Sequence, residues 1–143
     1  MERRRYYPRK NTSKSVAKNE MILCDTNIFV NLFRGQPNVK SALEKIGKDN
    51  VALSIITYAE FIYGTPKTKL SEVKTFFEQL IIIDLNTEIS KRFKGIILSY
   101  SFTHRVGIPD SLIAATALGQ GLTLYTENKK DFDFIPGIKF YKP

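Results

Sequence analysis

Four acidic residues occupy positions from which a folded chain can bring side chains together. Asp25 and Asp131 each follow an apolar run that predicts a strand, while Glu60 and Asp110 lie in the first turns of predicted helices. In open α/β sheets these junctions meet at the carboxyl edge of the strands, where ligands bind. Because converging carboxylates repel one another unless a cation lies between them, the pattern indicates a metal site.

Each acid also has a purely structural interpretation. Asp25 could cap the helix that follows it, and Asp110 would interact favourably with the dipole of its helix. The segments 57–60 (TYAE) and 128–131 (NKKD) have the spacing of capping boxes. Capping is the commoner role for any one of these acids taken alone. The coincidence of four acids, from four segments, at one edge of a sheet favours a shared site.

The composition restricts the metal that such a site would hold. Cys24 is the only cysteine and His104 the only histidine, which excludes a zinc site built from the usual nitrogen and sulfur ligands. Oxygen ligands favour a hard cation such as Mg²⁺ or Mn²⁺. We interpret Cys24 as a small buried residue rather than a nucleophile, since no base is suggested beside it.

The elements that would position the acids alternate along the chain. From Met21 onward, short apolar runs are separated by longer segments of helical spacing, the pattern of a parallel sheet covered by helices on both faces. Pro109 suits the first position of a helix, and Gly121 suits the end of one. The predicted strands are 21–25, 51–54, 81–84, 122–126 and, with a weaker pattern, 138–141. The predicted helices are 26–33, 38–47, 57–63, 68–79, 86–101 and 110–119.

The composition agrees with one folded domain. A chain of 143 residues can bury a real core, and contents of 43% hydrophobic and 12% aromatic residues are too high for a disordered protein. No stretch approaches the roughly 20 apolar residues that span a bilayer, and the N-terminus lacks the apolar segment of a signal peptide. We therefore expect a cytoplasmic protein without a membrane segment.

The first 20 residues are a basic arm by composition. They hold seven Lys and Arg residues and two Glu residues, so five of the eight net positive charges lie there, and they show no helical or strand periodicity. A solvated extension, an upstream start and an RNA-contacting arm all fit this composition. We divide the chain into an arm at 1–20 and a folded domain at 21–143.

Five segments of the folded domain carry a resemblance. They are 23–27 (LCDTN), 57–64 (TYAEFIYG), 109–117 (PDSLIAATA), 126–132 (TENKKDF) and 134–138 (FIPGI). In this order and spacing they resemble the PIN domain family, and more narrowly the VapC-type toxins of bacterial toxin–antitoxin pairs. The ordered set is far more specific than any one motif. The basic arm is a departure, because family members commonly begin near the position of Met21.

The resemblance implies both a fold and an activity. The fold would be α/β, a PIN-like three-layer arrangement with a central, mostly parallel sheet of about five strands and helices on both faces. The protein would be a Mg²⁺- or Mn²⁺-dependent endoribonuclease that hydrolyses RNA phosphodiester bonds through a metal-activated water. As the toxin of a toxin–antitoxin pair it would be neutralised by a cognate antitoxin protein, and it would usually be a homodimer.

The resemblance also implies roles for individual residues. Asp25, Glu60 and Asp110 match the three acids of the family, and Asp131 matches a fourth position at which the family varies. These four residues would hold the metal and carry catalysis. Four neutral residues would support them, Thr26 or Asn27 by orienting Asp25, and Thr126 or Asn128 by holding a metal-bound water.

Basic residues flank the predicted site. Lys129 and Lys130 stand beside Asp131, and Arg105 lies shortly before Asp110. Four carboxylates repel an RNA phosphate, so RNA binding should depend on the cation and on nearby basic residues. For any one of these residues a solvated surface position is the commoner role. Our hypothesis is that Lys129, Lys130 or Arg105 contacts substrate phosphates.

Two other functions fit parts of the pattern. The first is a non-catalytic PIN-like module that binds RNA or protein, and the presence of all four acids argues against it. The second is an aspartyl phosphatase of the haloacid dehalogenase kind, which also has an Asp at the end of its first strand. That family needs a second Asp two residues later, where this chain has Asn27.

Overall fold

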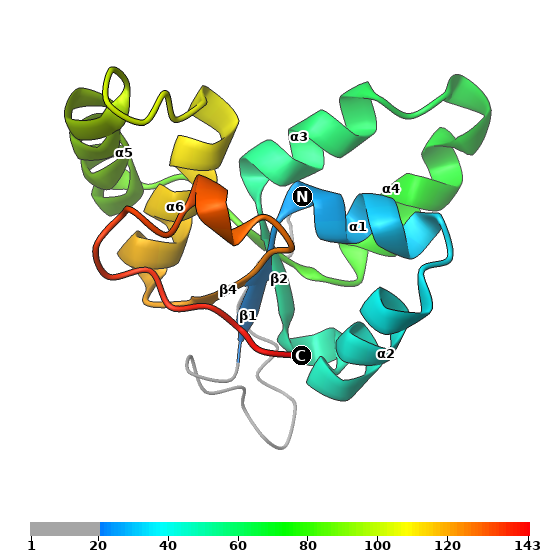
Figure 1. Ribbon diagram of the computed structural model, residues 1–143. Helices are drawn as coiled ribbons and strands as arrows, with labels where there is room; N and C mark the ends of the chain where they lie inside the picture. Colours follow the sequence, from blue (N-terminus) through cyan, green and yellow to red (C-terminus); the bar gives the residue numbers. More distant parts are fainter. Residues whose placement is uncertain (1–20) are drawn as a thin grey trace.

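A parallel sheet of four strands occupies the middle of the molecule (Figure 1). The structure, a computed structural model, describes residues 21–143, and the predicted arm at 1–20 lies outside them. The strand order is β3-β2-β1-β4 and all pairs are parallel. Because the chain runs outward from β1 to β3 and then crosses to β4, the strand order reverses between β1 and β4, which is where such sheets form a crevice. The strands are β1 (Ile22–Cys24), β2 (Val51–Ser54), β3 (Ile81–Ile83) and β4 (Thr123–Tyr125).

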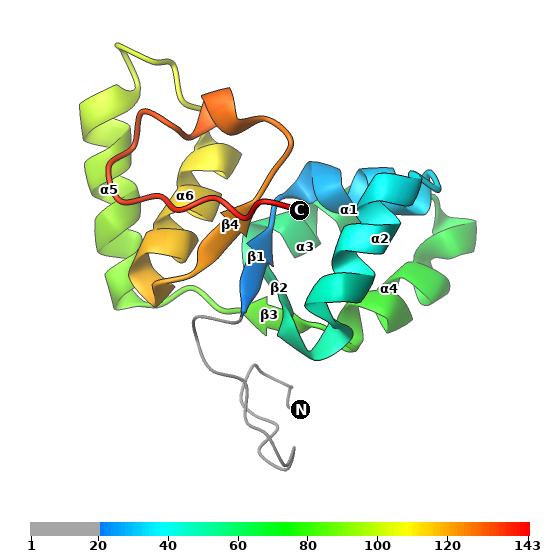
Figure 2. The same cartoon turned by 60° about the horizontal axis from the view of Figure 1, so that its bottom comes forward.

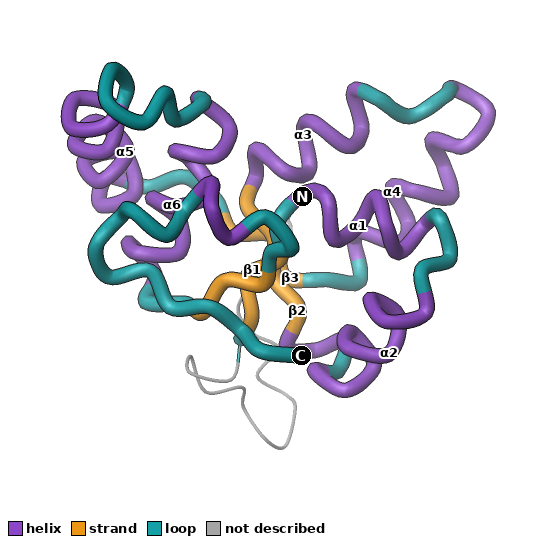
Figure 3. Tube along the Cα trace, viewed as in Figure 1, coloured by secondary structure: helices purple, strands orange, loops and turns teal. Residues whose placement is uncertain are grey.

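Helices cover both faces of this sheet, as predicted (Figures 1 and 3). Successive strand residues point to opposite faces. Leu23 and Ala52 pack with α5 and α6, whereas Ile22 and Cys24 pack with α1, α2 and α4. Each face therefore has its own buried core. The helices of the described residues are α1 (Thr26–Phe33), α2 (Pro37–Ile46), α3 (Ile55–Tyr63), α4 (Leu70–Glu78), α5 (Thr87–Tyr100) and α6 (Ile108–Gln120).

Helix α6 is the most deeply buried support of the predicted site. Ile113, Ala114 and Ala115 are at most 1% exposed, and the helix packs along the whole of α5 (Figure 2). It ends at Gly121, whose left-handed backbone (φ 67°) provides the predicted stop. Burial on this scale fixes the helix, and with it the position of Asp110 in its first turn.

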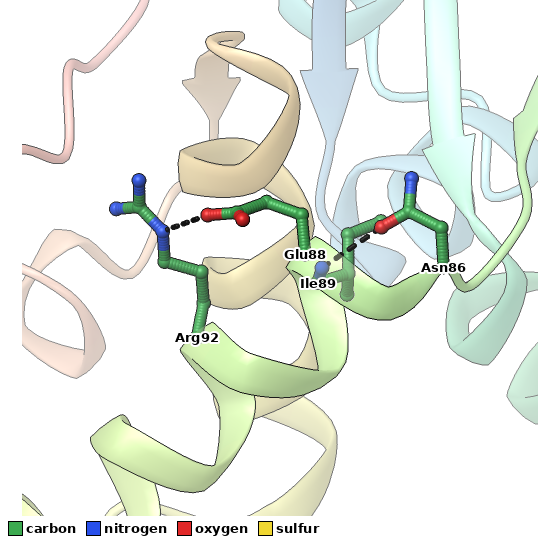
Figure 4. A network of polar contacts seen from close by, with 4 residues as sticks. All are labelled: Asn86, Glu88, Ile89 and Arg92. Carbon is green, nitrogen blue, oxygen red and sulfur yellow. Dashed lines mark hydrogen bonds and ion pairs between the residues drawn. The ribbon is translucent and has the colours of Figure 1, made fainter.

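The start of α5 is fixed by local polar contacts (Figure 4). Asn86 is the N-cap, and its side-chain oxygen accepts a hydrogen bond of 2.8 Å from the backbone N–H of Ile89. One turn on, Glu88 and Arg92 form an exposed ion pair of 2.8 Å at i,i+4 spacing. Such a cap contributes about 1 kcal/mol to helix stability, and the exposed pair less.

Three predictions about the elements are wrong in detail. The segment 138–141 is not a fifth strand, because it pairs with β4 only at an isolated bridge between Leu124 and Phe140 (Figure 2). The helix predicted over 57–63 begins at Ile55, and the helix predicted over 110–119 begins at Ile108. Pro109 is thus the second residue of α6 rather than the first.

No helix within residues 21–143 combines the length and the apolar character needed to cross a membrane.

Candidate metal centre

Asp25 lies at the point where β1 ends and α1 begins, next to the crevice between β1 and β4. Its side chain is the N-cap of α1, with Oδ1 accepting a hydrogen bond of 2.7 Å from the backbone N–H of Thr26. Its other oxygen, Oδ2, accepts a hydrogen bond of 2.8 Å from the hydroxyl of Thr126, which follows β4. Both oxygens are therefore oriented by neighbours, and the residue is only 5% exposed.

Thr126 connects Asp25 to the segment that carries Asp131. Its hydroxyl donates to Asp25 and also accepts a hydrogen bond of 3.0 Å from the backbone N–H of Asn128. The backbone N–H of Asp131 in turn donates to the carbonyl of Asn128 at 3.0 Å. Thr126 was predicted to hold a metal-bound water. In the structure its hydroxyl instead donates a hydrogen bond to the Asp25 carboxylate.

Glu60 reaches the same region from the middle of α3. Its Oε1 accepts a hydrogen bond of 2.8 Å from the hydroxyl of Thr26, the residue after Asp25. The predicted capping box at 57–60 does not exist, because Ser54 caps α3 by accepting a hydrogen bond of 3.2 Å from the backbone N–H of Thr57. Glu60 is consequently the sixth residue of its helix, and its structural interpretation as part of a cap is excluded.

Thr57 was predicted only as the first residue of a capping box at 57–60. It is fully buried, and its hydroxyl lies 3.0 Å from that of Thr26. Since a carboxylate only accepts, Thr26 donates to Glu60 and Thr57 is free to donate to Thr26. The signal for this role is the spacing, because a residue three positions before Glu60 lies on the same face of the helix.

Asp110 is half-buried in the first turn of α6, and the pKa of its carboxyl group is affected by the other acids. Its pKa is raised from 3.8 to about 6, first by burial and then by the negative charges of Asp25, Asp131 and Glu60. Burial also raises the pKa of Asp25, with further contributions from Asp131 and Glu60 that oppose its two hydrogen bonds. The structure thus places four acids from four segments close enough for their charges to affect one another.

The donor set suits a hard cation bound partly through water. All four acids offer oxygen ligands, and a divalent ion would offset the negative charges that, after burial, raise the pKa of Asp110. Among the residues of 21–143, no three Asp, Glu, His or Cys side chains lie close enough together to hold an ion as they stand. Mg²⁺ retains several waters and often takes only one or two carboxylates directly, so this arrangement fits Mg²⁺ better than an ion that requires a closed protein cage.

The comparison with known proteins identifies the family. The PIN domain family matches residues 22–137, which includes all four acids. The chain belongs to the PIN domain family. Among relatives of this PIN domain, the ribonuclease VapC1 of Methanocaldococcus jannaschii is 34% identical over 140 residues, covering 92% of this chain and 96% of the relative. The tRNA(fMet)-specific endonuclease VapC of Salmonella typhimurium is 28% identical, covering 82% and 93%.

A solved structure gives the same result for the fold. The PIN domain superimposes on a chain of a toxin–antitoxin complex from Klebsiella pneumoniae with a TM-score of 0.71 and 33% sequence identity, over 85% of this chain and 99% of that one. The predicted three-layer PIN-like fold is confirmed, with four strands and an isolated bridge in place of about five strands.

Hollows lie on two sides of the acids. Glu60 and Thr26 line a groove of about 510 Å³ between α1, α3 and α4, which also contains Phe33 and Phe61. Asp131 and Thr126 line a second hollow of about 490 Å³, together with Lys129 and Lys130. Of the four acids, Glu60 therefore borders one hollow and Asp131 the other.

The predicted phosphate-binding residues differ in their surroundings. Lys129 places its ammonium 5.7 Å from the centre of the Phe140 ring, a cation–π contact. Lys130 and Arg105 are exposed, and Arg105 has a left-handed backbone (φ 53°) in the turn before α6. Lys129 and Lys130 both line the hollow that contains Asp131.

Two further sequence predictions concern residues next to Asp25. Cys24 is buried, and burial together with the charge of Asp25 raises the pKa of its thiol, so it remains an unreactive thiol in the core. Asn27 is exposed on α1, and the residue that orients Asp25 is Thr26 through its backbone N–H.

Proposed function

We propose that this PIN domain is a Mg²⁺- or Mn²⁺-dependent endoribonuclease and the toxin of a toxin–antitoxin pair. The observation that carries the proposal is the placement of Asp25, Glu60, Asp110 and Asp131 at one edge of the sheet, where the pKa of Asp110 is raised first by burial and then by the other three charges. The names of the relatives support the nuclease activity. A bound divalent ion would lower the pKa of a water and neutralise charge on the scissile phosphate.

Some residues of the chain would bind the ion, and others would orient the residues that bind it. Asp25 and Asp110 are the inner acids, because one is buried and the other half-buried at the crevice. Glu60 and Asp131 are exposed and come from different parts of the chain, α3 and the segment after β4. Thr126 and the backbone N–H of Thr26 keep the Asp25 carboxylate in one orientation, and the Thr26 hydroxyl does the same for Glu60. Asp110 must release its proton before the ion binds.

Conservative variants test the nuclease assignment. Asp25→Asn, Glu60→Gln, Asp110→Asn and Asp131→Asn each remove one charge while keeping shape, and we expect each to reduce metal-dependent RNA cleavage by 10-fold or more. Glu72→Gln is the matched control, because Glu72 lines the 510 Å³ groove without contacting the four acids. Full activity in Asp25→Asn or in Glu60→Gln, with the fold intact by circular dichroism, would refute the assignment.

Growth and gene context test the toxin assignment. It is supported by the likeness to a toxin–antitoxin complex and predicts growth arrest when the chain is expressed, relieved by a small antitoxin encoded beside it. Harmless expression of an active enzyme from an isolated gene would contradict it. The family resemblance also leads us to expect a homodimer, which the mass of the purified protein in solution would test.

The non-catalytic module is the second candidate function. It predicts RNA or protein binding that persists unchanged in Asp25→Asn and in EDTA. The same variants therefore separate the two functions, because the nuclease loses its cleavage under both conditions.

A further inference from the structure

Glu127 makes polar contacts that the metal site described so far does not use. It lies between Thr126, which binds Asp25, and Asp131. Its Oε1 accepts a hydrogen bond of 2.6 Å from the side-chain amide of Asn31, and its Oε2 accepts one of 3.4 Å from that of Asn38. A single carboxylate thus connects the segment after β4 to both α1 and α2.

The segment that Glu127 holds has few other anchors. Tyr125 at one end is 2% exposed and Phe132 at the other is fully buried, whereas all residues of 127–131 are exposed. Between those two ends no side chain is buried after Thr126, and the segment is held by polar contacts and by the contact of Lys129 with the Phe140 ring. The first of these contacts is the Thr126 hydroxyl on Asp25, and the bridge from Glu127 to α1 and α2 is the second.

Helix α1 links the contact between Glu127 and Asn31 to Asp25. Asp25 caps the first residue of α1, and Asn31 lies on the same helix less than two turns later. When Glu127 binds Asn31, the segment 126–131 is therefore attached to the same rigid element that starts at Asp25. The Thr126 hydroxyl is kept on Asp25 Oδ2, and Asp131 is kept near enough to Asp25 and Asp110 for its charge to act on both carboxyl groups.

We propose that Glu127 is a positioning residue of the metal centre, acting through Asn31 and Asn38 to hold segment 126–131 against α1 and α2. This inference deepens the proposed function and rests on it for its consequence in catalysis. Residues that orient metal ligands without touching the ion commonly change metal affinity or activity by 10- to 100-fold when they are replaced. The contacts of Glu127 with Asn31 and Asn38 are both exposed, so we expect their loss to lower Mg²⁺ affinity by about 10-fold, the lower end of this range.

A reversal of the hydrogen bond tests the bridge. In the full-length protein, Glu127→Ala removes the acceptor, and Asn31→Asp places two carboxylates against each other. The double variant Asn31→Asp/Glu127→Gln exchanges donor and acceptor at an unchanged net charge. We expect Mg²⁺ affinity, measured by calorimetry, to fall about 10-fold in Glu127→Ala and in Asn31→Asp, and to return to within about twofold of the wild type in the double variant.

The kinetic signature separates positioning from a general loss of stability. RNA cleavage in Glu127→Ala should fall at low Mg²⁺ and recover at saturating Mg²⁺, with KM for RNA unchanged. Hydrogen exchange at the amides of Asn128 and Asp131 should become faster, because both N–H groups bond within the released segment. Glu44→Ala is the control, since it removes an equivalent exposed charge from α2 away from the bridge.

The outcomes distinguish this inference from the proposed function. If the protein binds Mg²⁺ but cleaves no RNA, the nuclease proposal fails, and the bridge is still judged by Mg²⁺ affinity and amide exchange. Unchanged Mg²⁺ affinity in Glu127→Ala overturns the inference, as does a double variant no better than the singles, or a wild-type protein without measurable Mg²⁺ binding.

Discussion

Asp110 carries a carboxyl group whose ionisation is opposed by its surroundings. Its pKa of about 6 in the folded, metal-free protein exceeds the ordinary value of 3.8. Between these values the folded state keeps a proton that the unfolded state has lost, so stability decreases as the pH rises through this window and stays reduced above about pH 6. The shift of Asp25 has the same direction and adds to the effect. The candidate metal centre is thus a local source of instability, which a bound cation would reduce.

This leads to a prediction about pH. With metal removed, the wild-type protein should have a higher Tm at pH 5.5 than at pH 7.5. The control variant Asp84→Asn, at an exposed acid, should show the same difference, because it keeps Asp110 and Asp25. Asp110→Asn should raise the Tm at pH 7.5 and weaken the pH dependence without abolishing it, because Asp25 still titrates. Scanning calorimetry at both pH values measures this. A Tm that rises with pH in the wild type and is unaffected by Asp110→Asn would contradict the account.

Helices α5 and α6 pack closely at Gly119. At Gly119 in α6, an added Cβ would lie 3.0 Å from Cγ1 of Ile89 in α5 and 3.4 Å from its Cα. We therefore expect Gly119→Ala to reduce the free energy of unfolding by about 1–3 kcal/mol. Gly95 in α5 is exposed with nothing within 4 Å of the added atom, so Gly95→Ala should increase it by about 0.5–1 kcal/mol. Urea denaturation measures both, and equal effects of the two substitutions would show that α5 and α6 do not pack this closely.

The sequence predicted the elements well where burial sets the pattern. Four apolar runs became strands because both faces of the sheet are covered, and α1 begins at Thr26 as expected because Asp25 caps it. The fifth predicted strand failed because Ile138 and Phe140 are placed by packing on the core, with backbone pairing to β4 limited to one bridge. Periodicity alone does not distinguish these two uses of an apolar run.

The site was predictable in its acids but not in the contacts that orient them. The four acids stand in motifs, and strand order brings those motifs together. The start of α3 was misplaced because the N-cap is Ser54, three residues before Thr57, and not Thr57 itself. Glu127 was missed because its partners Asn31 and Asn38 lie 96 and 89 residues away in the chain, and no local pattern signals so distant a contact.

Charge distribution is a property of the whole molecule. The chain has a net charge of +8, yet its candidate site is acidic, so the proposed function requires basic residues around the four acids to attract the RNA. We expect the combined variant Arg105→Gln/Lys129→Gln/Lys130→Gln to lower RNA affinity and to reduce the slope of log affinity against log salt by up to about 2. Lys48→Gln, at the opposite edge of the sheet before β2, is the control. An unchanged slope would remove these residues from the RNA interface.

The same measurement applies to the arm at 1–20, which lies outside the described residues. Replacing Arg3, Arg4 and Arg5 with Gln in the full chain reduces the salt dependence if the arm contacts RNA and leaves it unchanged if the arm is a solvated extension. Metal-dependent cleavage should persist in either case, because all four acids lie within 21–143.

Removing the metal and adding it back shows whether RNA cleavage depends on a divalent ion. Purified protein should cleave RNA in Mg²⁺, lose that activity in EDTA and regain it when excess Mg²⁺ is added, while Asp25→Asn, which keeps a capping side chain on α1, should remain inactive throughout. RNA cleavage that persists in EDTA, or that Asp25→Asn retains in full, would contradict a metal-dependent nuclease site built on these four acids.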